Sequence, residues 1–219
     1  MDKARTRELR RSLLALYEWS WAAKSYARIK LVLLPLREIS EELPKQGVIL
    51  DTGCGFGYVA NYLNLDSPEL VIVANDPVAS RVTSAQRTIG FRRNMELCAI
   101  DSRDSERANF DGASVVDALH HVPYDQQQAL IDDRYRKLKP GGLLVFRETD
   151  QRYGLRDYLF NCALEWLLYA GQEKTRFRPK REWMEMLQRP GFHSEQVVPN
   201  TWWFPYTTCL FFSRKAHHD

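Results

Sequence analysis

Two adjacent histidines, His120 and His121, are the side chains of this chain best suited to proton transfer. Imidazole exchanges a proton near neutral pH, so either ring could act as the general base for a hydroxyl group. Both follow the apolar stretch 112–119, and neighbours on an extended segment point to opposite sides. Only one is therefore expected to face a ligand, with His121 slightly favoured and Tyr124 as a further candidate. A structural role for both histidines stays open.

Acidic residues after a later apolar stretch could hold a substrate. Glu148 and Asp150 are two positions apart, so on a strand their side chains point the same way. Paired acids would hold an amine, whereas Arg147 or Arg152 would hold an acid, and Tyr153 is another candidate for substrate contact. The histidines and acids together match no known pattern of metal ligands, so no metal is expected.

The elements that position these residues begin at a glycine-rich turn. Gly53, Gly55 and Gly57 alternate after Asp51, between an apolar run and a stretch of helical spacing. Strand, tight loop and helix form the opening unit of a nucleotide-binding α/β sheet, and glycine lets the backbone approach a ligand closely. A dinucleotide fold requires G-x-G-x-x-G, but here the third glycine is one residue early and Tyr58 follows it. This spacing disfavours a nicotinamide-dependent oxidoreductase.

A second acid ends the next apolar run. Asp76 comes 25 residues after Asp51, near the separation at which nucleotide-binding α/β folds place an acid on the ribose hydroxyls. Pro77 suits the start of the next helix, because its missing N–H would be unpaired there. Asp76 could instead cap that helix, but its place at a strand end favours ribose contact.

Two further landmarks follow in order, Asp117-Ala118-Leu119-His120-His121 and Leu138-Lys139-Pro140-Gly141-Gly142. With the D-x-G-x-G-x-G pattern at 51–57, they make the chain from 48 to about 150 resemble the class I S-adenosylmethionine-dependent methyltransferases, in particular their small-molecule branch. The resemblance implies S-adenosylmethionine as the cofactor. It also implies a Rossmann-like α/β fold, a seven-stranded and mostly parallel doubly wound sheet whose last strand is antiparallel.

The resemblance also implies which positions bind the cofactor. Asp101 would face the adenine amino group, although a solvated acid in the charged stretch 101–107 is the alternative. His120 and His121 would lie where the acceptor and the methyl group meet. The cofactor-binding positions carried over are Asp51, Gly53, Cys54, Gly55, Gly57, Asp76, Pro77, Asp101, Ser102, Asp117, Ala118 and Leu119.

Two helical segments are expected outside this core. Residues 1–46 form an extension that covers the cofactor cleft or a sheet edge, and residues 47–219 form the methyltransferase domain with a lid at about 151–180. Trp19 and Tyr26 of the extension are expected to contact substrate. Its basic, tryptophan-bearing face leaves peripheral membrane contact open.

Composition indicates a single globular domain with elaborations. The net charge of +3 is the difference between 31 basic and 28 acidic residues, so the composition does not indicate the strongly basic surface of a nucleic-acid-binding protein. The four cysteines form no C-x-x-C pair, which suits reduced thiols in the cytoplasm. No signal peptide and no bilayer-spanning apolar run is visible, and the oligomeric state is not predicted.

We therefore expect an enzyme that methylates a small-molecule or lipid-like acceptor in bacterial secondary or lipid metabolism. An oxygen of an aromatic or apolar compound is favoured, because the aromatic segments offer large apolar contact area. Residues 117–120 lack the Asn/Asp-Pro-Pro-aromatic stretch of base-modifying enzymes, so nucleic acid is not expected as a partner. Methylation of nitrogen or carbon, and a cofactor-binding protein without turnover, remain alternatives.

Overall fold

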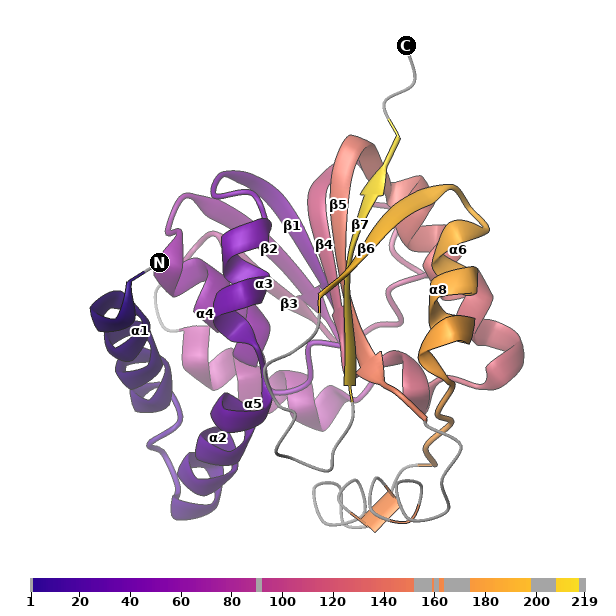
Figure 1. Cartoon of the computed structure of the whole chain (residues 1–219). Helices are drawn as coiled ribbons and strands as arrows, with labels where there is room; N and C mark the ends of the chain where they lie inside the picture. Colours follow the sequence, from indigo (N-terminus) through magenta and orange to yellow (C-terminus); the bar gives the residue numbers. More distant parts are fainter. Residues whose placement is uncertain are drawn as a thin grey trace. The chain divides into compact units, whose positions relative to one another are not determined.

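Apolar runs rich in Val, Ile and Leu form the first strands, as expected for parallel strands that are covered on both faces. Strands and helices alternate in the computed structural model: β1 (Gly47–Thr52), α4 (Tyr58–Asp66), β2 (Leu70–Asn75), α5 (Ala79–Ile89) and β3 (Met95–Cys98). β1 pairs in parallel with β2, and β2 pairs in parallel with β3 (Figure 1). Ile72 therefore lies between Ile49 and Met95. This is the predicted strand–loop–helix succession.

The described residues contribute seven strands to one mixed sheet, in the order β3-β2-β1-β4-β5-β7-β6. The later strands are β4 (Phe110–Val116), β5 (Leu138–Thr149), β6 (Phe192–Val197) and β7 (Thr208–Lys215). β7 runs antiparallel to both β5 and β6. The predicted Rossmann-like sheet with a reversed last strand is confirmed.

The structure describes residues 2–89, 92–151, 159, 162–163, 174–197 and 208–216. Most of the expected lid at 151–180 lies outside these residues, and so does Tyr153.

The chain divides into two compact units. One comprises Met1–Glu106 with Phe110–Ser114, and the other comprises Arg107–Asn109 with Val115–Asp219. The glycine loop, Asp76 and Asp101 belong to the first unit, while His120, His121 and the residues after β5 belong to the second. The expected boundary near residue 46 stays a prediction.

Three helices precede β1 in the first unit: α1 (Lys3–Ala15), α2 (Trp21–Leu33) and α3 (Leu36–Glu42). Asp2 and Ser20 begin α1 and α2 as side-chain caps, since each accepts a hydrogen bond from a main-chain N–H three residues on. Leu9 and Leu13 are buried, and α1 packs beside α4 (Figure 1). The expected helical extension is thus present over residues 3–42.

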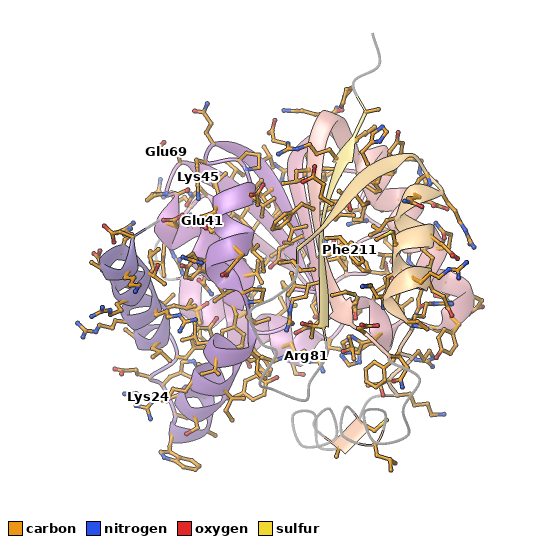
Figure 2. The ribbon with its side chains drawn as sticks, viewed as in Figure 1. Lys24, Glu41, Lys45, Glu69, Arg81 and Phe211 are labelled. Carbon is orange, nitrogen blue, oxygen red and sulfur yellow. The ribbon has the colours of Figure 1, made fainter. Side chains whose placement is uncertain are left out.

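In the second unit, α6 (Tyr124–Lys137) and α8 (Lys180–Gln188) pack on β5 and β6. Trp183 of α8 is fully buried and donates from Nε1 to the carbonyl oxygen of Thr149. The centroid of its ring lies 5.5 Å from that of Phe146, which lies 6.3 Å from that of Phe211. Phe211 is a residue of β7 and is labelled in Figure 2. This aromatic packing anchors the end of β5, where the candidate acids lie.

Candidate active site

The glycine loop between β1 and α4 is built from backbone that only glycine adopts easily. Gly53, Gly55 and Gly57 have φ angles of +66°, +53° and +79°. A Cβ at Gly57 would lie 3.2 Å from Nδ2 of Asn61, so this glycine permits close packing of the loop on α4. A Cβ at Gly55 would meet no atom within 4 Å. The loop therefore presents bare backbone to open space at Gly55, as a bound cofactor requires.

Asp76 holds this loop from the end of β2. Its Oδ2 accepts a hydrogen bond from the N–H of Gly55 at 2.9 Å, and its Oδ1 accepts one from Val78 at 2.9 Å. The contact with Val78, just before α5, is of the capping type that was the alternative to ribose contact. Each carboxylate oxygen can accept a second bond, so the ribose contact remains open to Asp76 and stays a prediction.

Asp51 is buried beneath the loop. Burial raises the pKa of its carboxyl group to about 7, although hydrogen bonds from Ser114 and from the backbone of Ala60 act to lower it. Burial likewise raises the pKa of the Cys54 thiol, so Cys54 is a packed thiol rather than a reactive thiolate. Burial thus raises the pKa of both side chains, one just before the loop and one within it.

The predicted adenine-binding acid has a partner in its own loop. Asp101 accepts hydrogen bonds from Nε of Arg103 at 3.0 Å and from Nη2 of Arg103 at 2.6 Å. Of the other predicted cofactor contacts, Ser102 is buried and Pro77 is exposed. Asp101 is thus half-buried and paired within its own loop, whereas the alternative was a solvated acid. Adenine contact stays a prediction for this residue.

A polar network that sequence reasoning missed ties the N-terminal segment to the glycine loop. The buried Tyr17 hydroxyl donates to the carbonyl oxygen of Phe56 at 2.8 Å and accepts from Nδ2 of Asn61 at 3.1 Å. Asn61 also donates to the carbonyl oxygen of Gly57 and to Thr88. Tyr17 lies among apolar residues at helical spacing, and such spacing gives no indication of a side-chain hydrogen bond.

In the second unit, two consecutive residues of β5 hold the turn that follows β4. Asp117 has a φ of +51°, and its N–H donates to the carbonyl oxygen of Arg147 at 2.9 Å. The buried guanidinium of Arg147 forms an ion pair with the Asp117 carboxylate. Arg147, expected as a partner for an acidic substrate, is thus a partner of this turn.

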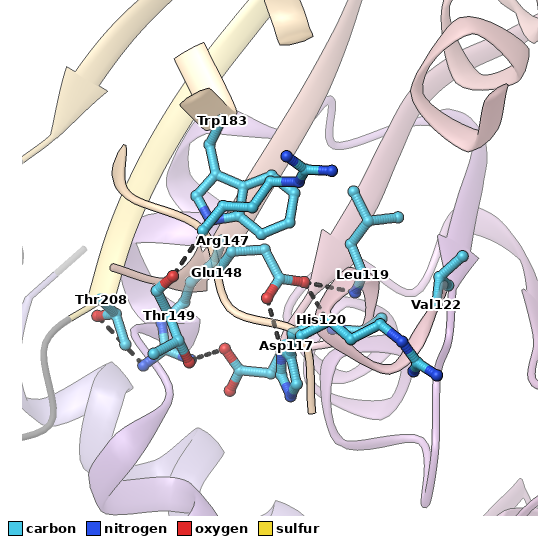
Figure 3. A network of polar contacts seen from close by, with 12 residues as sticks. Asp117, Leu119, His120, Val122, Arg147, Glu148, Thr149, Trp183 and Thr208 are labelled. Carbon is cyan, nitrogen blue, oxygen red and sulfur yellow. Dashed lines mark hydrogen bonds and ion pairs between the residues drawn. The ribbon is translucent and has the colours of Figure 1, made fainter. Parts of the chain in front are cut away.

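Glu148 is the centre of the polar network in Figure 3. Its Oε1 accepts from the backbone N–H groups of Ala118 at 3.0 Å and Leu119 at 2.5 Å, and its Oε2 lies 2.5 Å from Nδ1 of His120. The fully buried carboxylate of Glu148 is thus engaged by the turn and by His120, and its contact with a substrate stays a prediction. Cofactor contact by Asp117, Ala118 and Leu119 stays a prediction.

The two histidines lie in a short 3₁₀ turn, η1 (Leu119–His121), and not on an extended segment. The expectation that they point to opposite sides is therefore wrong. Their rings lie 4.1 Å apart, with His120 fully buried and His121 half-buried. The turn brings both rings together, and the ring of His120 is held by Glu148.

The remaining predicted site residues are spread over both units. Tyr124 is half exposed, and its hydroxyl donates to the carbonyl oxygen of Phe177. Asp150 accepts a hydrogen bond from the N–H of Lys180 at the start of α8, and its contact with a substrate stays a prediction. In the first unit, Tyr26 meets Phe56 of the glycine loop edge to face, at 5.4 Å, and Trp19 is largely exposed.

Among the described residues, no group of three or more His, Cys, Asp or Glu side chains is arranged to hold a metal ion. Nor does any helix in the described part of the chain have the length and apolar character needed to cross a bilayer.

This fold, with a glycine loop after β1 and an acid after β2, defines a Rossmann-like cofactor-binding protein. The chain matches the family model for a methyltransferase domain over residues 21–197. Because this match covers most of the chain, the chain belongs to the methyltransferase domain family. Membership confirms the resemblance to S-adenosylmethionine-dependent methyltransferases and supports that cofactor, which the open glycine loop fits.

Individual relatives are more distant. An S-adenosyl-L-methionine-dependent Diels-Alderase of Neonectria sp. (strain DH2) is 29% identical over 116 residues, which cover 53% of this chain and 44% of the relative. Carboxy-S-adenosyl-L-methionine synthase of Pectobacterium atrosepticum is 26% identical over 147 residues, covering 63% and 59%. The chain thus spans less than two thirds of the curated relatives that it matches.

Among solved structures, an O-methyltransferase family protein from Burkholderia thailandensis superposes with a TM-score of 0.69. The identity is 15%, and the match covers 90% of this chain and 60% of the other. At this identity the likeness shows the fold alone.

Proposed function

We propose that this chain is an enzyme that transfers the methyl group of S-adenosylmethionine to an oxygen of a small or lipid-like molecule of aromatic or apolar character. The observation that supports the proposal is the buried pair of His120 and Glu148 directly after β4. A carboxylate at Nδ1 fixes the tautomer and orientation of the ring and leaves the lone pair on Nε2. Such a base suits a hydroxyl acceptor, which must lose its proton as the new bond forms.

The other residues with proposed roles would bind the cofactor or orient the His120 ring. The cofactor, when bound, supplies an electrophilic methyl group on a sulfonium sulfur. The bare backbone at Gly55 and the carboxylate of Asp76 would hold its amino-acid and ribose portions, and Asp101 would meet the adenine. Glu148 fixes the turn and the His120 ring together, so it is a positioning residue. Alignment of the reacting groups accounts for much of the expected acceleration.

An apolar acceptor is supported by the aromatic side chains near the glycine loop. Tyr26 and Phe56 are half-buried and pack edge to face, which offers apolar aromatic surface in the first unit. Contact of Tyr26 with an apolar acceptor therefore stays part of the proposal. The free cysteines at 54, 98, 162 and 209 support a reducing location such as the cytoplasm.

The test is a transfer assay with methyl-labelled S-adenosylmethionine and a panel of hydroxylated aromatic and apolar compounds. His120→Asn keeps an N–H donor for Glu148 but lacks the Nε2 lone pair, so transfer should fall about a hundredfold with unchanged S-adenosylhomocysteine affinity. His121→Asn is the matched control and should keep most of the activity. Label found only on nitrogen or carbon, or a full rate in His120→Asn, contradicts the proposal.

A second candidate function is suggested by the Diels-Alderase relative. Such a protein would bind the cofactor and promote cyclisation of a substrate without consuming the methyl group. The same assay separates the two, because cyclisation yields an isomeric product and no S-adenosylhomocysteine. Release of S-adenosylhomocysteine in step with the product favours methyl transfer.

A further inference from the structure

Helix α2 carries an exposed apolar face. Trp21 is 84% exposed, Val32 is 61% exposed and Ile29 is 47% exposed. With about 3.6 residues per turn, positions 21, 29 and 32 fall on one side of the helix. The opposite side is buried in the first unit through Ala27 and Leu31. Exposed tryptophan and branched aliphatic side chains on one helix face are unusual for a surface that meets only water.

The two helices that contribute to this face, α2 and α5, carry basic residues but no acidic ones. Arg28 is exposed on the same side of α2 as Trp21 and Val32. Just before α2, Trp19 is 45% exposed and its ring is covered by the guanidinium of Arg87 from α5, at 5.0 Å.

The acid Glu18 lies close to this face, and its carboxylate interacts with Lys24 and with Arg28. Glu18 forms an exposed ion pair with Lys24, a residue of α2 that is drawn in Figure 2. The set Trp19, Trp21, Arg28, Ile29, Val32 and Arg87 is called the tryptophan face below.

We infer that the tryptophan face docks the protein on an anionic lipid surface. Tryptophan settles at the boundary between headgroups and acyl chains, and arginine at the same level meets lipid phosphates and carboxylates. Ile29 and Val32 add aliphatic contact that a bilayer accepts, whereas neither has a role against the phosphates or bases of a nucleic acid. Symmetric pairing of two copies through this face would bring Arg28 of each copy into the same apolar contact.

This inference goes beyond the proposed function and does not depend on which atom is methylated. Docking through α2 would hold the first unit at the membrane, where lipid-like acceptors are concentrated. Each basic residue near an anionic surface strengthens binding about fivefold, and screening by salt weakens it.

The experiment is co-sedimentation of the full chain with vesicles of phosphatidylcholine alone and of phosphatidylcholine mixed with phosphatidylglycerol. Binding to the mixed vesicles only, decreasing with added salt, is the expected result. Trp21→Ser should weaken binding about tenfold and Arg28→Ser about fivefold. Val71→Ser removes another exposed apolar side chain, on β2, and serves as the matched control that keeps full binding.

Three results would overturn the inference. One is absence of binding to the mixed vesicles, and another is equal loss of binding in Trp21→Ser and Val71→Ser. The third is a dimer in solution that Trp21→Ser converts to a monomer, because the face would then be an interface between copies. Retained S-adenosylhomocysteine binding in every variant shows that the fold is intact, so failure here leaves the proposed function untouched.

Discussion

Nδ1 of His120 lies 2.5 Å from Oε2 of Glu148, and neither side chain is exposed to solvent. The other oxygen of the same carboxylate accepts two backbone N–H groups of the turn that carries the histidine. A single carboxylate therefore fixes both the backbone and the imidazole, and a change at Glu148 should affect catalysis more than binding.

Glu148→Gln tests this arrangement. The amide oxygen can still accept hydrogen bonds from the turn. Its NH₂ group, however, faces Nδ1–H of His120, and two donors cannot form a hydrogen bond with each other. We expect methyl transfer to fall about a hundredfold, with S-adenosylhomocysteine affinity changed less than threefold and stability reduced by about 1–3 kcal/mol. A variant with wild-type turnover would remove the pair from the mechanism.

Tyr17→Phe tests whether the N-terminal segment supports the glycine loop. The substitution keeps the ring that packs on Tyr58 but removes the donor to Phe56 and the acceptor for Asn61. Loss of these bonds should lower the free energy of unfolding by about 1–3 kcal/mol and weaken S-adenosylhomocysteine binding about fivefold. Chemical denaturation and calorimetry measure the two effects, and unchanged affinity would show that the loop holds its shape without Tyr17.

Gly55→Ala and Gly57→Ala should separate binding from folding. At Gly55 the new Cβ meets no protein atom, so only the left-handed backbone costs stability, about 1–2 kcal/mol. That Cβ enters the space assigned to the cofactor, and binding should weaken more than tenfold. At Gly57 the Cβ also crowds Asn61 and Ala85, so this variant should lose more stability. Tight S-adenosylhomocysteine binding by Gly55→Ala would contradict the assignment of this loop.

Asp51 predicts a specific pH dependence. Its pKa is about 7 in the folded chain against about 3.9 when unfolded, so between these values the folded state holds the extra proton. The free energy of unfolding should therefore decrease as pH rises from about 4 to about 7, by a few kcal/mol, and then level off. Asp51→Asn lacks this proton, so its stability relative to wild type should rise across the same window. A constant difference between the two proteins would show that Asp51 titrates normally.

The glycine loop and the sheet could be predicted from sequence because their signals are local. Gly53, Gly55 and Gly57 need positive φ whatever surrounds them, and the apolar runs of β1 and β2 identify buried parallel strands. The reversed β7 came from the family resemblance. The glycine loop and the first two strands are thus encoded within a few consecutive residues each, whereas the direction of β7 is not.

The polar contacts of the site could not be predicted in this way, because they join residues far apart in sequence. Glu148 and His120 are 28 positions apart, and Tyr17 and Phe56 are 39 apart. Alternation along a strand was the wrong rule for His120 and His121, because the chain turns into a 3₁₀ segment at Leu119. Nor does alternation identify the partners of Glu148 and Asp150, which are the η1 turn and the start of α8.

The most direct test of the central claim, that this chain uses S-adenosylmethionine at the glycine loop, is calorimetric titration of the purified protein with S-adenosylhomocysteine. NAD serves as the control ligand, because the glycine spacing departs from the dinucleotide pattern. Micromolar binding of S-adenosylhomocysteine with none of NAD is the predicted result. Binding of NAD, or of neither ligand, would contradict the claim.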